Sequence, residues 1–427
     1  MRNGNYITVN EIFKGKYVQD KKVVAIVPNY QEEPNVVKNT IEKLLETNFY
    51  ARIKGMDFWL DEIILSDQSG EEMVKVNRGK MHISKESVAR YWGSHMLPEI
   101  YHFSLQDKLV EEIVQDYLGG IEEYKSHLKR KPPRGKGWNM FLSSLATGIQ
   151  PDEKVVLVFL DAENEQIGPD YPIALGAPLA NENSPYKFSK AAFVRHHMEG
   201  EKKSLGGRVN ASVGVALMDM LAEKGLAYKL YYSLSGEIGI RRDGWWSIRI
   251  PARYGVEKGT NLQLLSKLGN LKGFPLSAQE FYQVDVGVNM DQPLAEGQPK
   301  EVILQKIGEM TRQIIITVLG IGGETIKKVW KSPDEFMKDF VGAQERSLKR
   351  WLREGIPITG GLSVDELKEK TRSVVRGEIE RYYHGKLLRE EMENELLIPV
   401  YELKKRIGEV DFERFVKDVS TRKIEII

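Results

Sequence analysis

Two carboxylates that could hold a metal ion follow an apolar segment in the middle of the chain. The apolar residues 155–160 run directly into Asp161 and Glu163, which are spaced one residue apart. Such a run is typical of a strand buried on both faces, and ligands of open α/β sheets bind beyond the carboxyl ends of strands. Two acidic side chains at this spacing can share a hard divalent cation, which can in turn bind a diphosphate. Acidic residues also commonly end strands without any ligand, so the pair needs support from other segments.

Two earlier strands would help to position this pair. Residues 22–27 predict a buried strand that ends at Pro28 and continues into a polar loop. Asn35 is in place to cap the helix that follows, whose apolar positions keep helical spacing. Residues 62–67 predict a second strand, which also ends in a polar group, beginning with Asp67. Strand, helix and strand with ligand-type residues at the strand ends predict the start of a doubly wound α/β sheet.

Two basic residues stand beside glycines and could hold phosphate groups. Gly135 and Gly137 flank Lys136 at the end of a basic run, and they would let the backbone approach a ligand closely. A solvated linker explains the same run equally well. Two glycines also precede Arg208, so that backbone amides and a guanidinium could hold an anion together. An ordinary turn with a surface arginine is the simpler explanation of this second stretch when it is taken alone.

Two further carboxylates follow short glycine-containing runs, as sugar-binding sites often need. Glu237 and Glu257 each combine a compact backbone with an acceptor for vicinal hydroxyl groups. Residues 283–294 then predict a strand that runs into a polar loop.

The composition argues against several classes of function. The chain has 427 residues, enough for two domains or one large domain with an appendage. Its 62 Lys and Arg residues balance 61 Asp and Glu residues, so the protein has no large net positive charge that would attract nucleic acid or an anionic membrane. The absence of cysteine excludes a disulfide, a thiolate nucleophile and a cysteine–zinc site. The first residues lack the apolar stretch of a signal peptide, and the run 314–321 is too short to span a bilayer, so we expect a cytoplasmic protein.

The chain is predicted to have two parts. Residues 1–300 contain the strands and the candidate site, and the irregular stretch from about 71 to 130 is expected to be an insertion. Residues 301–427 are dense in charge and helix-like, with few strand signals. Apolar positions in these helices, such as Leu348 and Leu387, need a partner surface. We expect the helices to pack on the first part and to contribute to a homodimer.

Seven short segments in a fixed order resemble the glucosyl-3-phosphoglycerate synthases and the related mannosylglycerate synthases. These families are retaining glycosyltransferases of the GT-A fold. The resemblance implies an α/β GT-A domain with a doubly wound sheet, followed by a C-terminal helical region, and it covers roughly residues 22 to 294. The matching segments are Val27–Glu33, Gly135–Gly137, Leu160–Glu163, Gly207–Val209, Ser235–Glu237, Tyr254–Glu257 and Val284–Gly287.

The resemblance also implies roles for individual residues. Asp161 and Glu163 would stand at the metal motif of the family, with the second carboxylate as the principal ligand. Glu237 and Glu257 would lie near the transferred sugar. The residues expected to bind the nucleotide sugar are Pro28, Tyr30, Glu32, Asp67, Ser69, Lys136 and Asp161. The residues expected to grip the carboxylate or phosphate of the acceptor are Gly207, Arg208 and Asn210.

Three positions depart from the family pattern. Glu163 replaces an aspartate but still offers hard oxygen ligands, and Asn210 replaces a threonine of the acceptor loop. Asp291 stands where the family has a metal-binding histidine. As a third ligand it would make an oxygen-rich site that suits magnesium, manganese or calcium. The alternative is that Asp291 only opens a turn before Pro293.

The predicted function is metal-dependent transfer of glucose or mannose from a nucleoside diphosphate sugar to a small anionic acceptor. The resemblance implies 3-phosphoglycerate or glycerate as acceptor, Mg²⁺ or Mn²⁺ as cofactor, and compatible-solute synthesis as the setting. A retaining front-side substitution needs no enzyme nucleophile, so Glu237 and Glu257 are assigned to sugar positioning. A two-carboxylate glycosidase is disfavoured, because it needs neither the metal pair nor the glycine–arginine loop. Two alternatives stay open: a larger anionic acceptor, such as an inositol phosphate diester or a glucosylglycerate, and a non-catalytic nucleotide-sugar-binding protein.

Overall fold

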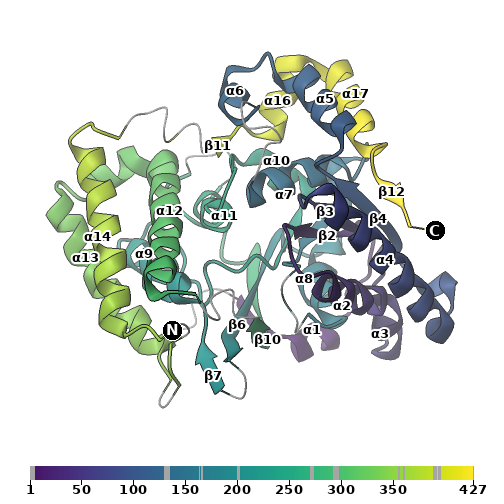
Figure 1. The fold of residues 1–427 in the computed structure, drawn as a ribbon, viewed down its shortest axis with the longest axis horizontal. Coiled ribbons are helices and arrows are strands. Elements are labelled where there is room, and N and C mark those ends of the chain that lie inside the picture. Colours follow the sequence, from purple (N-terminus) through teal and green to yellow (C-terminus); the bar gives the residue numbers. More distant parts are fainter. Residues whose placement is uncertain are drawn as a thin grey trace.

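A large mixed β-sheet lies at the centre of the protein (Figure 1). The computed structural model describes residues 5–128, 135–162, 164, 167–199, 202–269, 274–291, 298–353, 356–358, 361–387, 392 and 396–426. Within these residues the strands are β1 (Asn5–Thr8), β2 (Lys22–Asn29), β3 (Glu62–Asp67), β4 (Glu99–Ser104), β5 (Val155–Phe159), β6 (Phe188–Glu199), β7 (Lys202–Leu205), β8 (Ile238–Arg241), β9 (Ile250–Pro251), β10 (Phe281–Asp291), β11 (Leu396–Leu397) and β12 (Ile424–Glu425).

The order of strands brings several strand ends together at one edge of the sheet. The order is β1-β10-β6-β8-β5-β2-β3-β4-β12, with β7 paired to β6 and with β9 and β11 in a separate small sheet. Strands β5, β2, β3 and β4 are parallel neighbours, so their carboxyl ends lie side by side. Strand β8 is antiparallel between β5 and β6. The prediction of an α/β sheet with parallel central strands is confirmed.

The apolar run that precedes Asp161 is buried on both faces, as predicted. Every residue of β5 is buried. Leu157 packs into one apolar core, whereas Val156 and Val158 pack into the other, on the opposite face of the sheet. Successive side chains of a strand point to opposite faces, so an apolar run without alternation fits a central strand covered on both sides.

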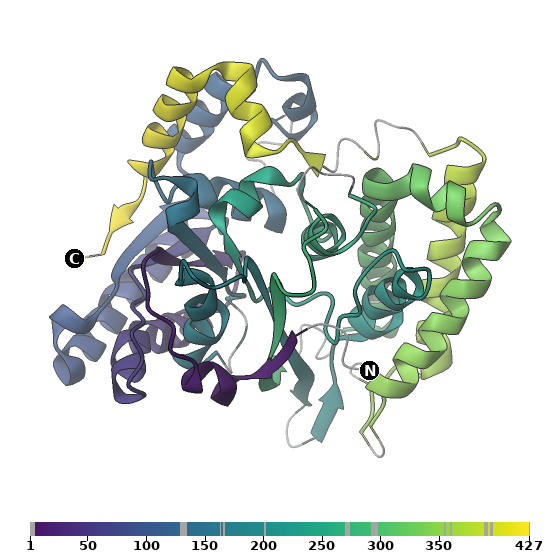
Figure 2. The ribbon, with the colours of Figure 1, turned by 180° about the vertical axis from the view of Figure 1, so that it is seen from behind.

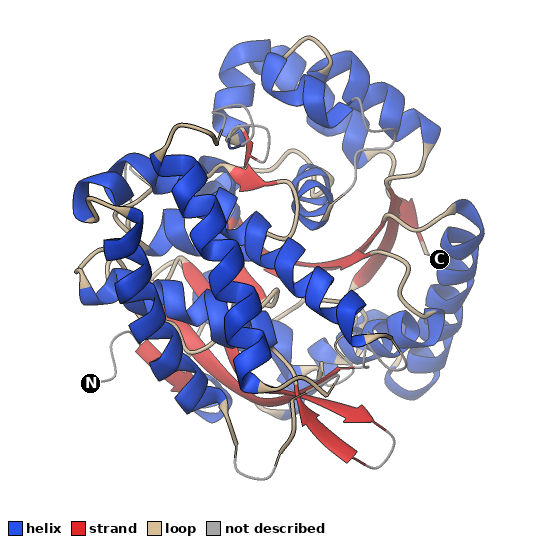
Figure 3. Cartoon of the chain, turned by 60° about the vertical axis from the view of Figure 1, so that its left-hand side comes forward, coloured by secondary structure: helices blue, strands red, loops and turns tan. Residues whose placement is uncertain are grey.

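Helices cover both faces of the sheet (Figures 2 and 3). Residues of α7 belong to one apolar core, and those of α2 and α8 belong to the other. The helices before residue 300 are α1 (Val9–Lys14), α2 (Pro34–Leu45), α3 (Thr47–Ile53), α4 (Glu71–Trp92), α5 (Lys108–Leu118), α6 (Glu122–Leu128), α7 (Lys136–Leu145), α8 (Asp170–Ala180), α9 (Val215–Glu223), α10 (Arg242–Ser247) and α11 (Val256–Leu265).

The start of α2 differs from the prediction. The helix begins at Pro34, and its N-cap is Glu33 rather than Asn35. Proline suits the first helical position, because its missing N–H would have no partner there and its φ is already helical. Asn35 therefore lies inside the first turn.

The stretch from 71 to 130, expected to be an insertion, contributes a strand to the sheet. Helix α4 leads from β3 to β4, and β4 pairs with β3 in parallel register. The strand is hard to recognise in the sequence because it buries a polar residue. His102 is fully buried, and its Nε2 lies 3.3 Å from Oδ2 of Asp67 on the neighbouring strand.

The C-terminal region divides into two parts that lie on different sides of the protein (Figure 1). The first part packs on α9 and α11, and the second packs on α5, α7 and α10. Strand β12 then pairs antiparallel with β4 and extends the sheet at its edge. The helices are α12 (Lys300–Val329), α13 (Pro333–Trp351), α14 (Val364–Tyr383), α16 (Val400–Ile407) and α17 (Glu409–Ser420).

Several apolar positions of this region are covered within the chain itself. Leu348 is 1% exposed and Leu387 is 5% exposed. No helix in the part of the chain that the structure describes combines the length and the apolar character needed to cross a bilayer.

Candidate active site

A cavity of about 540 Å³, lined by both apolar and charged side chains, opens at the carboxyl ends of the parallel strands. Its walls come from the loops after β2, β3 and β5, from the start of α7, and from helix α12 of the C-terminal region. The described residues that line it are Pro28, Asn29, Tyr30, Glu32, Gln68, Gly135, Lys136, Asn139, Asp161, Ala162, Arg195, Leu234, Arg253, Tyr254, Glu257, Met310, Gln313 and Ile314. Six residues predicted to act in the site are among them: Pro28, Tyr30, Glu32, Lys136, Asp161 and Glu257.

Lys136 joins two of the predicted carboxylates. Its Nζ lies 2.5 Å from Oδ1 of Asp161 and 2.7 Å from Oε1 of Glu257. Burial lowers the pKa of this ammonium, but the charges of Asp161 and Glu257 outweigh burial and raise the pKa above the ordinary lysine value. The centre of the cavity therefore holds a cation between two anions.

The glycines beside Lys136 allow close contact with another part of the backbone. A Cβ on Gly137 would lie 1.7 Å from the carbonyl oxygen of Pro251, and a Cβ on Gly135 would lie 2.3 Å from that of Ala252. Gly135 also has a φ of 136°, which disfavours other residues. The N–H of Trp138 donates to the Ala252 carbonyl at 3.1 Å. The structure shows that these glycines pack against the chain at 251–252, and Gly135 also lines the cavity, so the close approach to a ligand predicted from the sequence stays a prediction.

The loop between residues 235 and 237 packs against Asp161. A Cβ on Gly236 would lie 2.3 Å from both carboxylate oxygens of Asp161. Glycine at this position therefore leaves the room that the Asp161 carboxylate occupies beside Lys136.

Replacement of Gly236 by Ala is expected to displace the Asp161 carboxylate and to lower turnover at least tenfold. Because the clashing atoms belong to a side chain that can rotate, the midpoint of thermal unfolding should change little. Initial rates and calorimetric unfolding of the variant measure the two effects. Unchanged turnover would show that the position of the Asp161 carboxylate is unimportant.

Glu237 lies behind the wall of the cavity rather than in it. Its side chain accepts hydrogen bonds from Nδ2 of Asn164 and from Oγ of Ser235, both at 2.9 Å, and the residue is 1% exposed. Burial and the nearby charge of Asp161 raise the pKa of its carboxyl group. In this arrangement Glu237 fixes the loop that packs against Asp161, and its predicted place beside the sugar stays a prediction.

Asp67 and Ser69, expected to bind the nucleotide, are fully buried and support the neighbouring loop. Oδ1 of Asp67 accepts a hydrogen bond from Nδ2 of Asn29 at 3.0 Å. Oγ of Ser69 accepts one from the N–H of Gln31 at 2.9 Å. In the structure the side chain between them, Gln68, lines the cavity. Alternation along the chain explains the difference, because neighbouring side chains at a strand end point in opposite directions.

The buried Asp67 carboxylate is held in its charged form by hydrogen bonds. Burial raises the pKa of Asp67, but hydrogen bonds from His102, Asn77 and Ser69 outweigh burial and lower the pKa below the ordinary value. This network fixes the end of β3 beside the loop that carries Tyr30.

The predicted acceptor loop adjoins the cavity but does not line it in this structure. Gly207 has a φ of 72°, in the left-handed region that favours glycine. Oδ1 of Asn210 accepts hydrogen bonds from the N–H groups of Ser233 and Leu234, both at 2.9 Å. The buried Asn210 side chain is therefore part of the support of the neighbouring loop, and Arg208 is partly exposed.

Two of the three predicted metal ligands cannot be compared with the structure. Glu163 lies outside the described residues, and so does the side chain of Asp291, whose backbone pairs with His197 at the end of β10. Among the described residues, no three His, Asp or Glu side chains converge in a way that could hold a metal ion. Asp161 is the predicted ligand whose carboxylate the structure places in the cavity.

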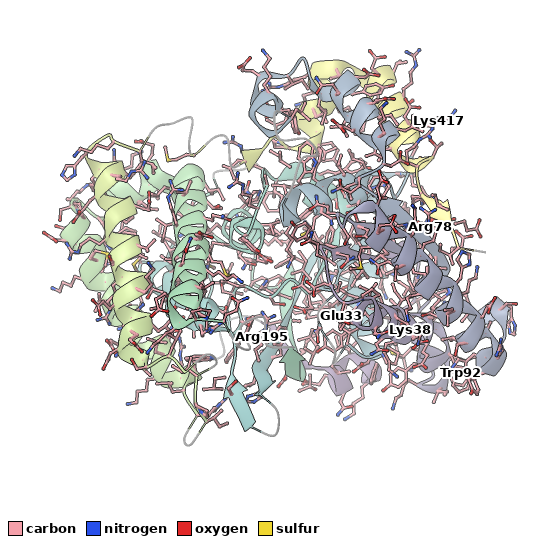
Figure 4. All side chains as sticks on the ribbon, in the orientation of Figure 1. Glu33, Lys38, Arg78, Trp92, Arg195 and Lys417 are labelled. Atoms are coloured by element: carbon pink, nitrogen blue, oxygen red, sulfur yellow. The ribbon has the colours of Figure 1, made fainter. Side chains whose placement is uncertain are left out.

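Several residues of the cavity were not recognised in the sequence. Arg195 comes from β6 and lies in the middle of the protein, between the sheet and the C-terminal helices (Figure 4). In the sequence, an arginine that directly follows the apolar residues 191–194 could have indicated a charged residue at the end of a strand. Gln313 and Ile314 come from α12, and nothing in their local sequence indicates that this helix closes the cavity.

The buried Lys190 predicts a measurable dependence of stability on pH. Its Nζ donates to the carbonyl of Ser235 at 2.8 Å, and burial lowers the pKa of Lys190 to about 8. Between that value and the ordinary lysine pKa, the unfolded chain binds a proton that the native protein has lost, so folding stability rises with pH. Relative to Lys190→Met, the stability of the wild type should rise by up to about 1.4 kcal/mol per pH unit above pH 8. Urea unfolding at pH 7.5, 8.5 and 9.5 measures this difference, and a constant difference would contradict it.

Fold and cavity together define an α/β protein with a site at the carboxyl ends of parallel strands, in which a lysine bridges two carboxylates. No protein-family model matches the sequence. The chain is 28% identical over 134 residues to a glucosyl-3-phosphoglycerate synthase of Methanococcoides burtonii. The match covers 30% of this chain and spans about a third (31%) of the length of that relative. This similarity confirms the family resemblance recognised in the sequence.

Solved structures of related enzymes also resemble this chain at a greater distance. A glucosyl-3-phosphoglycerate synthase of Mycobacterium tuberculosis in complex with phosphoglyceric acid is 19% identical, with a TM-score of 0.46, and the match covers 75% of this chain and 88% of that chain. A mannosyl-3-phosphoglycerate synthase of Rubrobacter xylanophilus is 17% identical, with a TM-score of 0.45 and coverage of 73% and 79%.

Proposed function

We propose that this protein is a metal-dependent, retaining glycosyltransferase. It would transfer glucose or mannose from a nucleoside diphosphate sugar to a small anionic acceptor such as 3-phosphoglycerate or glycerate, as a step in compatible-solute synthesis. The observation that carries the proposal is the cavity in which Lys136 bridges Asp161 and Glu257. The similarity to a glucosyl-3-phosphoglycerate synthase supports the same reaction class.

The carboxylate of Asp161 lines the cavity and offers the hard oxygen ligands that magnesium and manganese prefer. Asp161 would hold the ion, together with Glu163 and Asp291 as further ligands. When bound, such an ion neutralises the charge that develops on the departing diphosphate.

The residues of the chain bind and orient the two substrates in this proposal. Tyr30 and Glu32, on the loop after β2, line the cavity and would contact the nucleotide, and Lys136 would contact its diphosphate. Glu257 would accept hydrogen bonds from the hydroxyl groups of the sugar. Helix α12 lines the cavity with Met310, Gln313 and Ile314, which would shield the transferred sugar from water. No side chain is required as a nucleophile.

A panel of donors and acceptors tests this proposal. The purified protein is incubated with uridine, guanosine or adenosine diphosphate sugars, each with glycerate, 3-phosphoglycerate or glucosylglycerate, and release of the nucleoside diphosphate is followed. We expect release that requires both an acceptor and Mg²⁺ or Mn²⁺. Nucleotide binding without release for any pair would instead support a non-catalytic nucleotide-sugar-binding protein.

Arg208 is proposed to hold the anionic group of the acceptor. Arg208→Lys is expected to raise the KM for the acceptor at least tenfold and to leave that for the donor nearly unchanged. Lysine keeps the charge but loses the two parallel N–H groups of the guanidinium. Steady-state kinetics with each substrate varied in turn measure both constants.

Arg346→Lys is the matched control for this substitution, because Arg346 makes a two-oxygen contact with Glu223 on the surface, at 2.6 and 2.7 Å. The control should change neither constant. An acceptor KM that is the same in Arg208→Lys and in the wild type would assign Arg208 to the support of its loop.

A homodimer remains part of the proposal. Several apolar positions that motivated it are buried within one chain, so a dimer would use another surface. Light scattering at micromolar concentration distinguishes monomer from dimer, and a mass of one chain would contradict this part.

A further inference from the structure

The ammonium of Lys136 lies between two carboxylates of the cavity, where a cation is attracted from both sides. Its two partners, Asp161 and Glu257, are only 16% and 11% exposed, so neither carboxylate is fully solvated. Lys136 contacts Oδ1 of Asp161, and a divalent ion bound to the same carboxylate would be repelled by the nearby ammonium charge. The two cations therefore compete for one carboxylate.

The backbone of Lys136 cannot move away to make room for another cation. The two flanking glycines press against the backbone at residues 251–252, and the N–H of Trp138 is tied to Ala252. The ammonium can therefore leave Asp161 only by rotation of the Lys136 side chain. The 22% exposure of that side chain toward the cavity leaves a path for such a rotation.

In the wild-type protein, the loop of Gly236 confines the Asp161 carboxylate on one side. Gly236 lies against this carboxylate, and the loop of Gly236 is anchored by Glu237, Asn164 and Ser235. The carboxylate thus stays in place while its cationic partner changes. A diphosphate entering the cavity would offer Lys136 new anionic oxygens in exchange for those of Asp161.

We propose that Lys136 acts as an internal counter-ion that keeps the divalent cation out of the site until a nucleoside diphosphate binds. This inference rests on the proposed function. Without nucleotide, the ammonium holds Asp161 and Glu257, and the affinity for the metal is low. With nucleotide, Lys136 turns to the diphosphate and Asp161 becomes available to the metal. Nucleotide and metal therefore bind with positive coupling, which is reciprocal by thermodynamic linkage.

Binding of Mn²⁺ alone tests the inference without any sugar transfer. Free Mn²⁺ is measured by electron paramagnetic resonance in titrations of the wild type, Lys136→Met and Lys136→Arg. We expect Lys136→Met to bind Mn²⁺ at least tenfold more tightly than the wild type, because the competing charge is gone. Lys136→Arg keeps a cation and should stay within about threefold of the wild type. Lys187→Met, which removes a lysine 2.5 Å from Glu280 outside the cavity, is the control and should change nothing.

The same titrations with uridine, guanosine or adenosine diphosphate measure the coupling. The nucleotide that binds should raise the affinity for Mn²⁺ at least fivefold more in the wild type than in Lys136→Met. If Lys136→Met does not fold, as judged by circular dichroism, Lys136→Gln replaces it.

Equal affinities of wild type and Lys136→Met for Mn²⁺ alone would overturn the inference and leave the proposed function standing. Absence of Mn²⁺ binding by every variant, even with nucleotide, would overturn both.

Discussion

Replacement of Asp161 by Ala is expected to lower turnover by about a hundredfold or more while the protein stays folded. The carboxylate ends a strand whose own residues are completely buried, but it faces the cavity and not the core. Its loss removes the charge that would hold the metal against the departing diphosphate, and loss of comparable charge stabilisation costs two to three orders of magnitude in other enzymes. Turnover is measured in chelator-treated buffer resupplied with Mg²⁺ or Mn²⁺.

Glu182→Ala is the matched control for Asp161→Ala. Glu182 also forms an ion pair with a lysine, Lys154, at 3.1 Å, but both side chains are exposed. It should retain wild-type turnover, since exposed ion pairs contribute little. Near-normal activity of Asp161→Ala after resupply of the metal would remove this residue from the site.

Replacement of Gly137 by Ala is expected to destabilise the protein by about 3 kcal/mol and to abolish most of its activity. The added Cβ would lie 1.7 Å from the carbonyl oxygen of Pro251, which is backbone and cannot rotate aside. Either α7 or the chain at 251–252 must shift, and the adjacent Lys136 would lose its position between Asp161 and Glu257. Urea unfolding and initial rates measure the two effects.

Gly79→Ala provides the control for the added methyl group. Gly79 lies in α4, and a Cβ there would meet no atom within 4 Å. Alanine favours a helix, so this variant should gain up to about 1 kcal/mol and keep full activity. A Gly137→Ala variant as stable and active as Gly79→Ala would contradict the close contact at Pro251.

The strands of the centre of the sheet were predictable because burial on both faces leaves a plain apolar run in the sequence. The predicted strand at 62–67 matches β3, and the run before Asp161 matches β5 closely. Strand β4 was missed, since His102 replaces an apolar residue and its burial depends on a hydrogen bond to Asp67, which is remote in sequence. Strand β12 is two residues long and becomes a strand only by pairing with β4.

The candidate site was predictable where a residue lies on a loop at the end of a strand, and less so elsewhere. Asp161 and Tyr30 follow β5 and β2, and both line the cavity. Asp67 was expected to bind the nucleotide because it is an acidic residue at the end of a strand. The direction of its side chain, however, depends on hydrogen-bond partners such as Asn77 and His102. The contribution of Gln313 could not be foreseen, because the packing of α12 on α11 decides it.

The configuration of the sugar in the product tests the central claim most directly. The protein is incubated with an α-linked nucleoside diphosphate glucose or mannose, 3-phosphoglycerate and Mn²⁺, and the anomeric proton of the product is followed by NMR from the first turnovers. The account predicts an α-linked glycosyl acceptor that forms only with metal and is absent with Asp161→Ala. A β-linked product would contradict retention, and release of free sugar without glycosylated acceptor would contradict transfer itself.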